Sequence, residues 1–346
     1  MTKMEQEILE QPKALRAALE YNRDTVREIV KEAEERSLTN AYFSARGTSD
    51  HASIYGQYLL GVYKGITTGS ALPSAFTLYG SQIDLLNSMV LGVSQSGQAA
   101  DALAVLQNAR EQGALSVAVT NDEQSPMAKA ADYHLYCAAG VEESVAATKS
   151  FTTEMAIMAM LAGEWSGNSQ LLEGLKRVPD AVEEFLQTLP AQLDKLVPRY
   201  RYMTEGFTLA RGMSYPVALE AALKIQETNY IKMKGYATSD FYHGPLAQID
   251  KDTPVILFAA QGPAFDGAKE MVEKLEGIGA EVIVVSDDVD YAAASPFGFA
   301  VPNLGSDCFA PFFFAVFAQL FACKLAVTRG HNPDAPRLLK KVTVTR

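Results

Sequence analysis

Cysteine is scarce in this chain: only Cys137, Cys308 and Cys323 occur in 346 residues, and no two form a CxxC pair. This argues against a disulfide framework and a structural zinc site, and it indicates a reducing compartment. Positive charge is also in short supply, because 30 basic residues face 41 acidic ones and the net charge is −11. No basic surface for nucleic acid or an acidic membrane is therefore expected, and a small molecule is the predicted partner.

Long apolar runs are nearly absent as well. The N-terminus, MTKMEQEILEQPKAL, is charged and lacks the apolar region of a secretory signal, so a cytoplasmic protein is expected. One segment, 309–327, approaches the length of a membrane span, but Pro311, Gln319 and Lys324 interrupt it. We expect a buried helix of an α/β domain there, because 48% hydrophobic residues supply enough core for two domains.

The chain contains one pattern twice. Residues 41–122 alternate apolar strand and helix in the order βαβαβ, and the same order returns over residues 207–288. The strands are continuous apolar runs, as expected when helices cover both faces of a parallel sheet. Ala45-Arg46-Gly47 matches Ala210-Arg211-Gly212, and Ser96-Gly97 matches Gln261-Gly262. The sequence therefore predicts two tandem, doubly wound α/β domains that arose by duplication.

Helical segments flank the two repeats. Apolar residues recur at helical spacing over 171–197, and a charged helical stretch over 4–36 is expected to pack against the first domain. The predicted organisation is an N-terminal helical segment (1–40), a first domain (41–170), a helical linker (171–200), a second domain (201–328) and a C-terminal tail (329–346).

A polar loop follows the second apolar strand of the first repeat. Ser94, Gln95, Ser96 and Gly97 stand where a helix begins, and its unpaired N–H groups favour an anion such as phosphate. The serines could instead serve only as a helix cap and a turn. The second repeat has AAQG at the equivalent place, which keeps the glycine and drops both serines. The GxGxxG and GxxxxGK[ST] motifs are absent, so a small phosphorylated metabolite is favoured over a nucleotide.

Six ordered motifs carry a family resemblance: GTS (47–49), SQSG (94–97), VAATKSFT (145–152), ALEAALKIQE (218–227), HGPLA (243–247) and KVT (341–343). In this order they resemble the sugar isomerase (SIS) double-domain family, which includes the isomerase half of glucosamine-6-phosphate synthase and stand-alone relatives. The resemblance implies two tandem SIS domains. Each would be a doubly wound, parallel, five-stranded sheet flanked by helices, a flavodoxin-like α-β-α sandwich.

The resemblance also implies roles for particular residues. The phosphate ligands would be Ser49, Ser94, Gln95 and Ser96, with Thr48 beside them. The substrate pocket would include Gly47, Gly97, Val145, Ala146 and Glu220, with Thr148 and Lys149 continuing its wall. The catalytic residues would be Glu227, His243 and Lys341, with Lys224 in support; the adjacent Lys340 is the alternative for the lysine.

The residue types fit aldose–ketose chemistry independently. Ring opening and proton transfer between C1 and C2 need acid/base groups, for which a carboxylate and an imidazole are suitable. Glu220, Lys224 and Glu227 share one face of a predicted helix at spacings of four and three. Such a trio is most often a solvated stripe, but this helix is otherwise rich in Ala, Leu and Ile, which suits a solvated face poorly. A lone histidine such as His243 is usually structural, and its motif is what favours a catalytic role.

Several positions depart from the family pattern and bear on the reaction. The synthase has a glutaminase domain with a cysteine directly after the initiator Met, whereas Thr2 follows Met1 here, so no glutamine-derived ammonia and no synthase reaction are expected. Ala99 stands where many relatives have a hydroxyl, and Ala147 and Asp240 replace the synthase's Ser and Glu. Tyr242 replaces a basic residue of many relatives, which leaves the choice of substrate open.

Three functions are compatible with the sequence. The first is a glucosamine-6-phosphate deaminase that yields fructose-6-phosphate and ammonia; the second is a deglycase that splits fructosamine-6-phosphates. The third is a non-catalytic sugar-phosphate sensor, but that would not need Glu227, His243 and Lys341 together, and no helix-turn-helix output segment is evident. The family resemblance implies a homodimer. No metal cluster is visible in the sequence, and the reaction needs no metal or cofactor.

Overall fold

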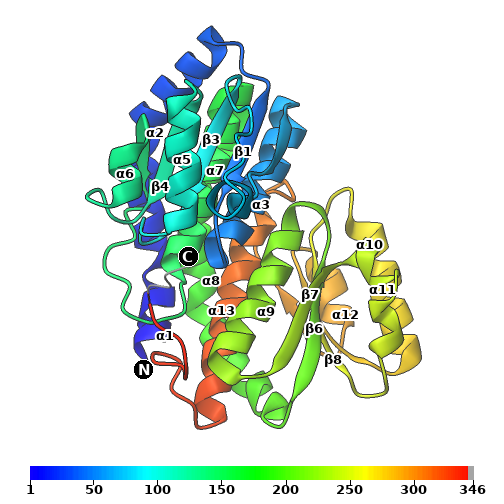
Figure 1. Ribbon diagram of the computed structural model, residues 1–346. Coiled ribbons are helices and arrows are strands. Elements are labelled where there is room, and N and C mark those ends of the chain that lie inside the picture. Colours follow the sequence, from blue (N-terminus) through cyan, green and yellow to red (C-terminus); the bar gives the residue numbers. More distant parts are fainter. Residues whose placement is uncertain (342–346) are drawn as a thin grey trace. The chain divides into compact units, whose positions relative to one another are not determined.

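The computed structural model describes residues 1–341. The chain separates into two compact units, each with its own sheet (Figure 1). The first-sheet unit comprises Glu10–Glu142, Ala147–Lys176 and the tail residues Lys340 and Lys341. The second-sheet unit comprises Met1–Leu9, Glu143–Ala146 and Arg177–Leu339.

The first sheet is parallel throughout and has the strand order β2-β1-β3-β4-β5. Its strands are β1 (Asn40–Ser44), β2 (Thr67–Ser70), β3 (Ser88–Val93), β4 (Leu115–Thr120) and β5 (Tyr133–Tyr136). Every residue of β3 and β4 is buried, which explains why these strands read as unbroken apolar runs. The order reverses between β1 and β3, because the chain leaves these neighbouring strands in opposite directions.

Helices cover both faces of the first sheet. They are α2 (Gln11–Glu35), α3 (Thr48–Leu59), α4 (Pro73–Thr77), α5 (Ala100–Glu111), α6 (Pro126–Ala130) and α7 (Lys149–Ser166). Helices α5 and α6 pack on one face, and α2, α3 and α7 pack together on the other (Figure 1). Helix α7 is buried around almost its whole circumference, so any polar side chain that it carries must find a partner inside the unit.

The second sheet repeats this topology. Its order is β10-β9-β8-β6-β7, again parallel throughout. Its strands are β6 (Glu205–Ala210), β7 (Lys232–Ala237), β8 (Pro254–Ala259), β9 (Glu281–Ser286) and β10 (Gly298–Ala300). Counted within each unit, both sheets have the order 2-1-3-4-5. The predicted fold class, two doubly wound parallel five-stranded sheets flanked by helices, is confirmed.

The helices of the second-sheet unit are α1 (Lys3–Leu9), α9 (Tyr215–Asn229), α10 (Thr238–Phe241), α11 (Phe265–Ile278), α12 (Val289–Ala294) and α13 (Ala310–Thr328). The long helix α8 (Ser169–Leu196) begins in the first-sheet unit and continues into the second. Helices α9 and α13 cover one face of the second sheet, and α11 and α12 cover the other (Figure 1).

Helix α13 has the length and apolarity of a membrane span, but 89% of its most apolar window is buried inside the structure. Its phenylalanines pack beneath the second sheet, where Phe258 meets Phe314 and Phe317. Its lysine, Lys324, lies at the rim of the core and forms ion pairs with Glu5 and Asp194. The predicted buried helix over 309–327 is confirmed to within one residue at each end.

Four strands were not identified in the sequence: β2, β5, β7 and β10. All but β7 have four residues or fewer, and all four lie at the edges of their sheets. They are only partly buried and contain sequences such as TTGS and KMKGYA. An edge strand has one pairing neighbour and one partly solvated side, so it needs no continuous apolar run. The pattern that revealed the central strands is therefore missing from these four.

Candidate functional site

Two predicted phosphate loops lie at the switch point of the first sheet. Strands β1 and β3 are neighbours, with Ser44 in register with Gly92. Gly47–Ser49 follows β1 and Ser94–Gly97 follows β3, so both segments leave the carboxyl edge of the sheet at adjacent strands. This is where open α/β sheets bind ligands.

The loop Ser94–Gly97 is tied to the neighbouring strand by its backbone. The N–H of Ser94 donates to the carbonyl of Val119 at 3.0 Å, and the carbonyl of Gln95 accepts from Asn121 at 2.9 Å. Gly97 has φ +61°, and a Cβ there would lie 2.2 Å from Ser125 Oγ. Both the backbone conformation and the close approach therefore require glycine, as the repeat comparison indicates.

The serines of this loop are not helix caps. Helix α5 begins after Ala99, and neither serine caps it; in its first turn the Asp101 carboxylate accepts a hydrogen bond from the N–H of Ala102 at 2.9 Å and pairs with Arg46 at 2.7 Å. Ser94, Gln95 and Ser96 are half-buried, and Ser96 Oγ accepts a 3.3 Å hydrogen bond from the N–H of Gln98 within the turn. The hydroxyls and amide thus stand beside a helix N-terminus, a place that suits an anion, and the negative charge that Asp101 brings there is paired with Arg46.

Ser49 and Thr48 occupy the first turn of α3, which begins after Gly47 at φ +56°. Thr48 is half-buried, whereas Ser49 is buried and its hydroxyl donates to Glu154 Oε1 at 2.9 Å. A hydroxyl has a single proton. In this arrangement the Ser49 proton is directed to a buried carboxylate on α7, and its oxygen retains only acceptor capacity.

The predicted trio on α9 lies in the core of the second-sheet unit. The side chains of Glu220 and Lys224 are fully buried, and that of Glu227 is 21% exposed. Lys224 Nζ lies 3.3 Å from Glu220 Oε1 and also donates to Glu227 Oε2. The trio is therefore a buried charge cluster, as the apolar composition of the helix predicts. Within it, Glu227 is the member whose carboxylate reaches the surface.

The charges in this cluster are mutually dependent. Burial by itself would lower the pKa of Lys224, but the two carboxylates Glu220 and Glu227 more than reverse this, so the pKa is raised above its ordinary value. Lys224 is therefore an ammonium at neutral pH, held between two carboxylates. This ammonium donates a hydrogen bond to the carboxylate of Glu227.

His243 lies in the turn between α10 and the short helix Pro245–Gln248. Its N–H donates to the carbonyl of Asp240 at 3.0 Å, and its side chain is exposed. Within residues 1–341 its ring makes no hydrogen bond or ion pair, with the trio on α9 or with any other group. Its neighbour Tyr242 is also exposed. His243 is thus accessible to a ligand. His134, in contrast, is half-buried, and its ring forms a hydrogen bond with the Thr120 hydroxyl.

Lys341 belongs to the first-sheet unit and forms an ion pair with a residue that the sequence did not single out. Its Nζ donates to Glu142 Oε2 at 2.9 Å, and Lys340 beside it is exposed. Of the two candidate lysines, Lys340 and Lys341, Lys341 is thus the one that pairs with a buried carboxylate. The rest of the KVT motif, Val342 and Thr343, lies outside the described residues.

The predicted substrate wall divides between the two units. Val145 and Ala146 belong to the second-sheet unit, and Ala146 is buried while Val145 is half-buried. Thr148 and Lys149 belong to the first-sheet unit, where both are buried. The Lys149 amine donates to Glu10 at 2.6 Å and to the carbonyl of Val141. These contacts are structural, because they hold the start of α7.

Several buried carboxylates were missed in the sequence, among them Glu142 and Glu154. Glu154 had a signal, because it is the lone charged residue in the apolar stretch TTEMAIMAML, where a charge needs a partner. Glu142 lies in VEES, which resembles an ordinary charged loop. Only the folded structure shows that one of the two adjacent glutamates is buried and the other exposed.

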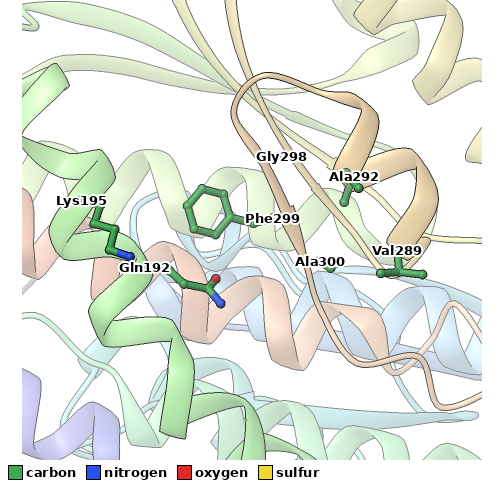
Figure 2. A pocket seen from close by; sticks show the side chains of 8 residues that line it. Gln192, Lys195, Val289, Ala292, Gly298, Phe299 and Ala300 are labelled. Atoms are coloured by element: carbon green, nitrogen blue, oxygen red, sulfur yellow. The ribbon is translucent and has the colours of Figure 1, made fainter.

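Two cavities lined by described residues lie apart from the predicted site residues. Figure 2 shows one of about 410 Å³, where Gln192 and Lys195 extend from α8 beside the edge strand β10. Its other lining residues are Val289, Ala292, Ala293, Gly298, Phe299 and Ala300. Another of about 420 Å³ lies near α5 and is lined by Gln82, Ile83, Asp84, Asn108, Glu111 and Gln112. Neither contains a predicted site residue. Within residues 1–341, no cluster of three or more His, Cys, Asp or Glu side chains could hold a metal ion.

Comparison with known proteins gives consistent results. The model of the SIS domain family matches residues 36–163 and 206–329. The isomerizing glutamine–fructose-6-phosphate aminotransferase of Thermococcus kodakarensis is 34% identical over 354 residues, covering 99% of this chain and 58% of that protein. The chain thus spans somewhat more than half the length of this relative.

Solved structures resemble the whole chain. A protein from Silicibacter pomeroyi DSS-3, described provisionally as a phosphosugar isomerase, is 29% identical with a TM-score of 0.86, covering 96% of this chain and 100% of that one. Glucosamine-6-phosphate deaminase from Thermotoga maritima has a TM-score of 0.81 at 22% identity, covering 99% of this chain and 100% of that one. At that identity, the second likeness concerns the fold alone.

Proposed function

This chain belongs to the SIS domain family, and we propose that it converts glucosamine-6-phosphate and water into fructose-6-phosphate and ammonia. Its relation to isomerizing aminotransferases supports an aldose–ketose reaction on a sugar phosphate. The observation that carries the proposal is the trio on α9, where one carboxylate reaches the surface beside a buried ammonium. A binding protein has no need to bury two charges behind a single accessible carboxylate.

The phosphate end of the substrate would be held at the switch point of the first sheet. Ser94, Gln95 and Ser96 would donate hydrogen bonds to phosphate oxygens, and the N-terminus of α5 would add its partial positive charge. Gly97 supports the shape of this loop, because it allows the turn and its close packing against Ser125. Thr48 would contribute its hydroxyl from the neighbouring loop, and Ser49 would donate to the phosphate once its hydroxyl proton turns away from Glu154.

The chemistry would proceed in three balanced steps. His243 would protonate the ring oxygen as the C1 hydroxyl loses its proton, which opens the sugar to an aldehyde. Glu227 would take the proton from C2 and deliver one to C1, while a proton passes from the amine nitrogen to the C1 oxygen, so that the C2 amine becomes an imine and C1 becomes a hydroxymethyl group. Water would then add to the imine carbon and expel ammonia, leaving the C2 ketone.

Glu220 and Lys224 would support Glu227 without touching the substrate, because both are fully buried. Lys224 would keep a positive charge beside Glu227, and the negative charge of Glu220 would compensate that positive charge in the core. Lys341 would bind an oxygen of the open chain or form a transient imine with its carbonyl. Val145 and Ala146 would border the sugar.

The direction of the reaction is proposed from sequence resemblance. Asp240 before FYHGP, together with ARGTSD and the closing KVT, resembles stand-alone amino-sugar-phosphate deaminases more than the synthase. We propose on the same basis that the protein is a cytoplasmic homodimer.

Fructosamine-6-phosphate deglycation is the second candidate, and one observation favours it. Tyr242, next to His243, is 45% exposed, and in many relatives a basic residue occupies this position. An exposed phenol offers an apolar face with a polar tip, which could receive the amine-bearing part of a fructosamine phosphate. The same acid and base groups would then release an amine in place of ammonia.

Ammonia release from glucosamine-6-phosphate tests the proposal directly. The purified protein should release ammonia and fructose-6-phosphate in equal amounts, and Glu227→Gln should lower kcat by about 10²- to 10⁴-fold with sugar-phosphate binding retained. Glu270→Gln, the same change at an exposed position on α11, is the matched control and should leave kcat unchanged. Turnover of fructoselysine-6-phosphate without ammonia from glucosamine-6-phosphate would favour the deglycase. No turnover of either substrate would refute both.

A further inference from the structure

Glu142 is a buried carboxylate to which the proposed function gives no role. It follows β5 in the first-sheet unit, and its side chain is fully buried. It accepts hydrogen bonds from the N–H of Thr148 at 2.9 Å, the N–H of Ser150 at 3.2 Å, the Thr148 hydroxyl at 3.4 Å and the Ser150 hydroxyl at 2.9 Å. The fifth donor is the amine of Lys341 at 2.9 Å.

These donors fix the carboxylate at one end of a helix. Thr148 is the N-cap of α7, and Ser150 lies in its first turn, so both N–H groups point out of the helix end. No side chain caps α7 from the Thr148 position itself, and Glu142 takes that place from outside the helix. A carboxylate at the N-terminus of an 18-residue helix is stabilised by the helix dipole as well as by hydrogen bonds.

Glu142 is therefore held in its ionised form. Burial by itself would raise the pKa of this carboxyl group, but the charge of Lys341 and the N–H groups of Thr148 and Ser150 outweigh it, and the pKa is lowered. The N–H groups at the start of α7 hold the Glu142 carboxylate in place. The carboxylate in turn holds the cation that pairs with it. The cation that it contacts comes from position 341, which is 199 residues away in sequence.

We propose that Glu142 is the positioning residue for Lys341, and that it fixes the ammonium of the tail at the substrate-binding edge of the first-sheet unit. The proposal rests on the proposed function for the role of Lys341 in the reaction. Without an anchor, the long side chain of Lys341 would sample many rotamers, and a rigid acceptor removes that freedom before substrate arrives. An ammonium has three N–H donors, so pairing with Glu142 is compatible with donation to an oxygen of the open-chain sugar.

Kinetics test the functional half of this proposal. Glu142→Gln keeps the size of the side chain but removes its charge, and it should lower kcat by about tenfold or more with little change in KM. Lys341→Met should lower kcat at least as far. The double variant Glu142→Gln/Lys341→Met should be no slower than Lys341→Met alone, because Glu142 acts through Lys341. If the decreases in kcat of the two single variants multiplied in the double variant, the proposal would be overturned. Multiplied decreases are what a purely structural role of Glu142 predicts.

Amine labelling tests the positional half without any turnover. With acetic anhydride as the probe and mass spectrometry as the readout, Lys341 should be acetylated several-fold faster in Glu142→Gln than in the wild type. Glu143→Gln is the matched control, because Glu143 is adjacent, exposed and paired with Lys3, and it should leave the Lys341 rate unchanged. An equal rate in Glu142→Gln and the wild type would overturn the proposal.

The kinetic and labelling experiments together distinguish a failure of the positioning role of Glu142 from a failure of the proposed function. If no sugar phosphate is turned over but Lys341 labelling accelerates in Glu142→Gln, the reaction is wrong and the positioning of the tail stands. If turnover is normal and labelling is unchanged, the function stands and Glu142 has no positioning role. Should Glu142→Gln fail to fold, Lys341→Arg serves in its place. This variant keeps the charge and should retain more kcat than Lys341→Met, and equal losses in the two would overturn the proposal.

Discussion

Lys224→Met is the most informative perturbation of the buried trio. The lysine is fully buried and lies between two carboxylates, so its removal leaves Glu220 buried without its cation. Breaking a buried ion pair from one side destabilises proteins by about 3–5 kcal/mol. Glu227 is 21% exposed, so water can partly replace its partner. The cost therefore falls mainly on Glu220, and we expect a loss near the lower limit, about 3 kcal/mol.

The assay must distinguish the two units, because they can unfold separately. The single tryptophan, Trp165, belongs to the first-sheet unit, and its fluorescence reports the unfolding of that unit in urea. Hydrogen exchange of the α9 amides reports the second-sheet unit. Lys224→Met should accelerate exchange in α9 by about two orders of magnitude, corresponding to the expected 3 kcal/mol, while the Trp165 transition moves little.

The control is a lysine with the same spacing on a solvated helix face. Lys176 pairs with Glu173 at i,i+3 on α8, and both side chains are about two-thirds exposed. Lys176→Met should change stability by less than about 1 kcal/mol, because exposed pairs contribute little. Adding Glu220→Gln to Lys224→Met should recover part of the loss, because it removes the unpaired charge. If Lys224→Met destabilised the second-sheet unit no more than Lys176→Met destabilises the protein, the buried trio would not be the charge cluster described above.

The effect of Lys224 has a defined pH range. The pKa of Lys224 is raised in the folded protein, so its stabilising effect is fully present below the unfolded value of about 10.4. It is lost as pH rises through the folded value. The difference in α9 protection between the wild type and Lys224→Met should be constant from about pH 7 to 9 and should narrow only above about pH 10.4.

Three further predictions concern the first-sheet unit. Gly97→Ala should destabilise it by about 1–3 kcal/mol in urea, because the Cβ meets another side chain and φ is positive; Gly47→Ala, with positive φ and open space, should cost less. The lowered pKa of Glu142 gives stability that is present above the unfolded value of about 4.3 and is lost as pH falls, so the urea midpoints of the wild type and Glu142→Gln should converge between about pH 5 and 3. Glu154→Met, which removes both acceptor oxygens, should free the Ser49 proton for the ligand and tighten fructose-6-phosphate binding by about 1 kcal/mol, roughly fivefold, in calorimetry; weaker binding would refute this.

The sequence by itself determined the architecture and part of the site. Unbroken apolar runs identified the central strands, because a strand covered by helices on both faces must be apolar along its whole length. The repeat comparison identified Gly97 as the residue that the turn requires. The structure gives the reason, because the backbone at Gly97 has a positive φ. The charged trio in an otherwise apolar helix predicted its own burial. These signals are local, because each depends on residues within one element.

The tertiary structure decided what depends on residues far apart in the chain. The edge strands exist because a neighbouring strand pairs with them, and their own sequences are too short and polar to show it. Ser49 gives its proton to Glu154, 105 residues away, and Lys341 is distinguished from Lys340 by a carboxylate 199 residues away. Glu142 and Glu143 are identical in type and adjacent, yet only one is buried. Which polar group meets which is set by the packing of elements, and no pattern within a single element contains that information.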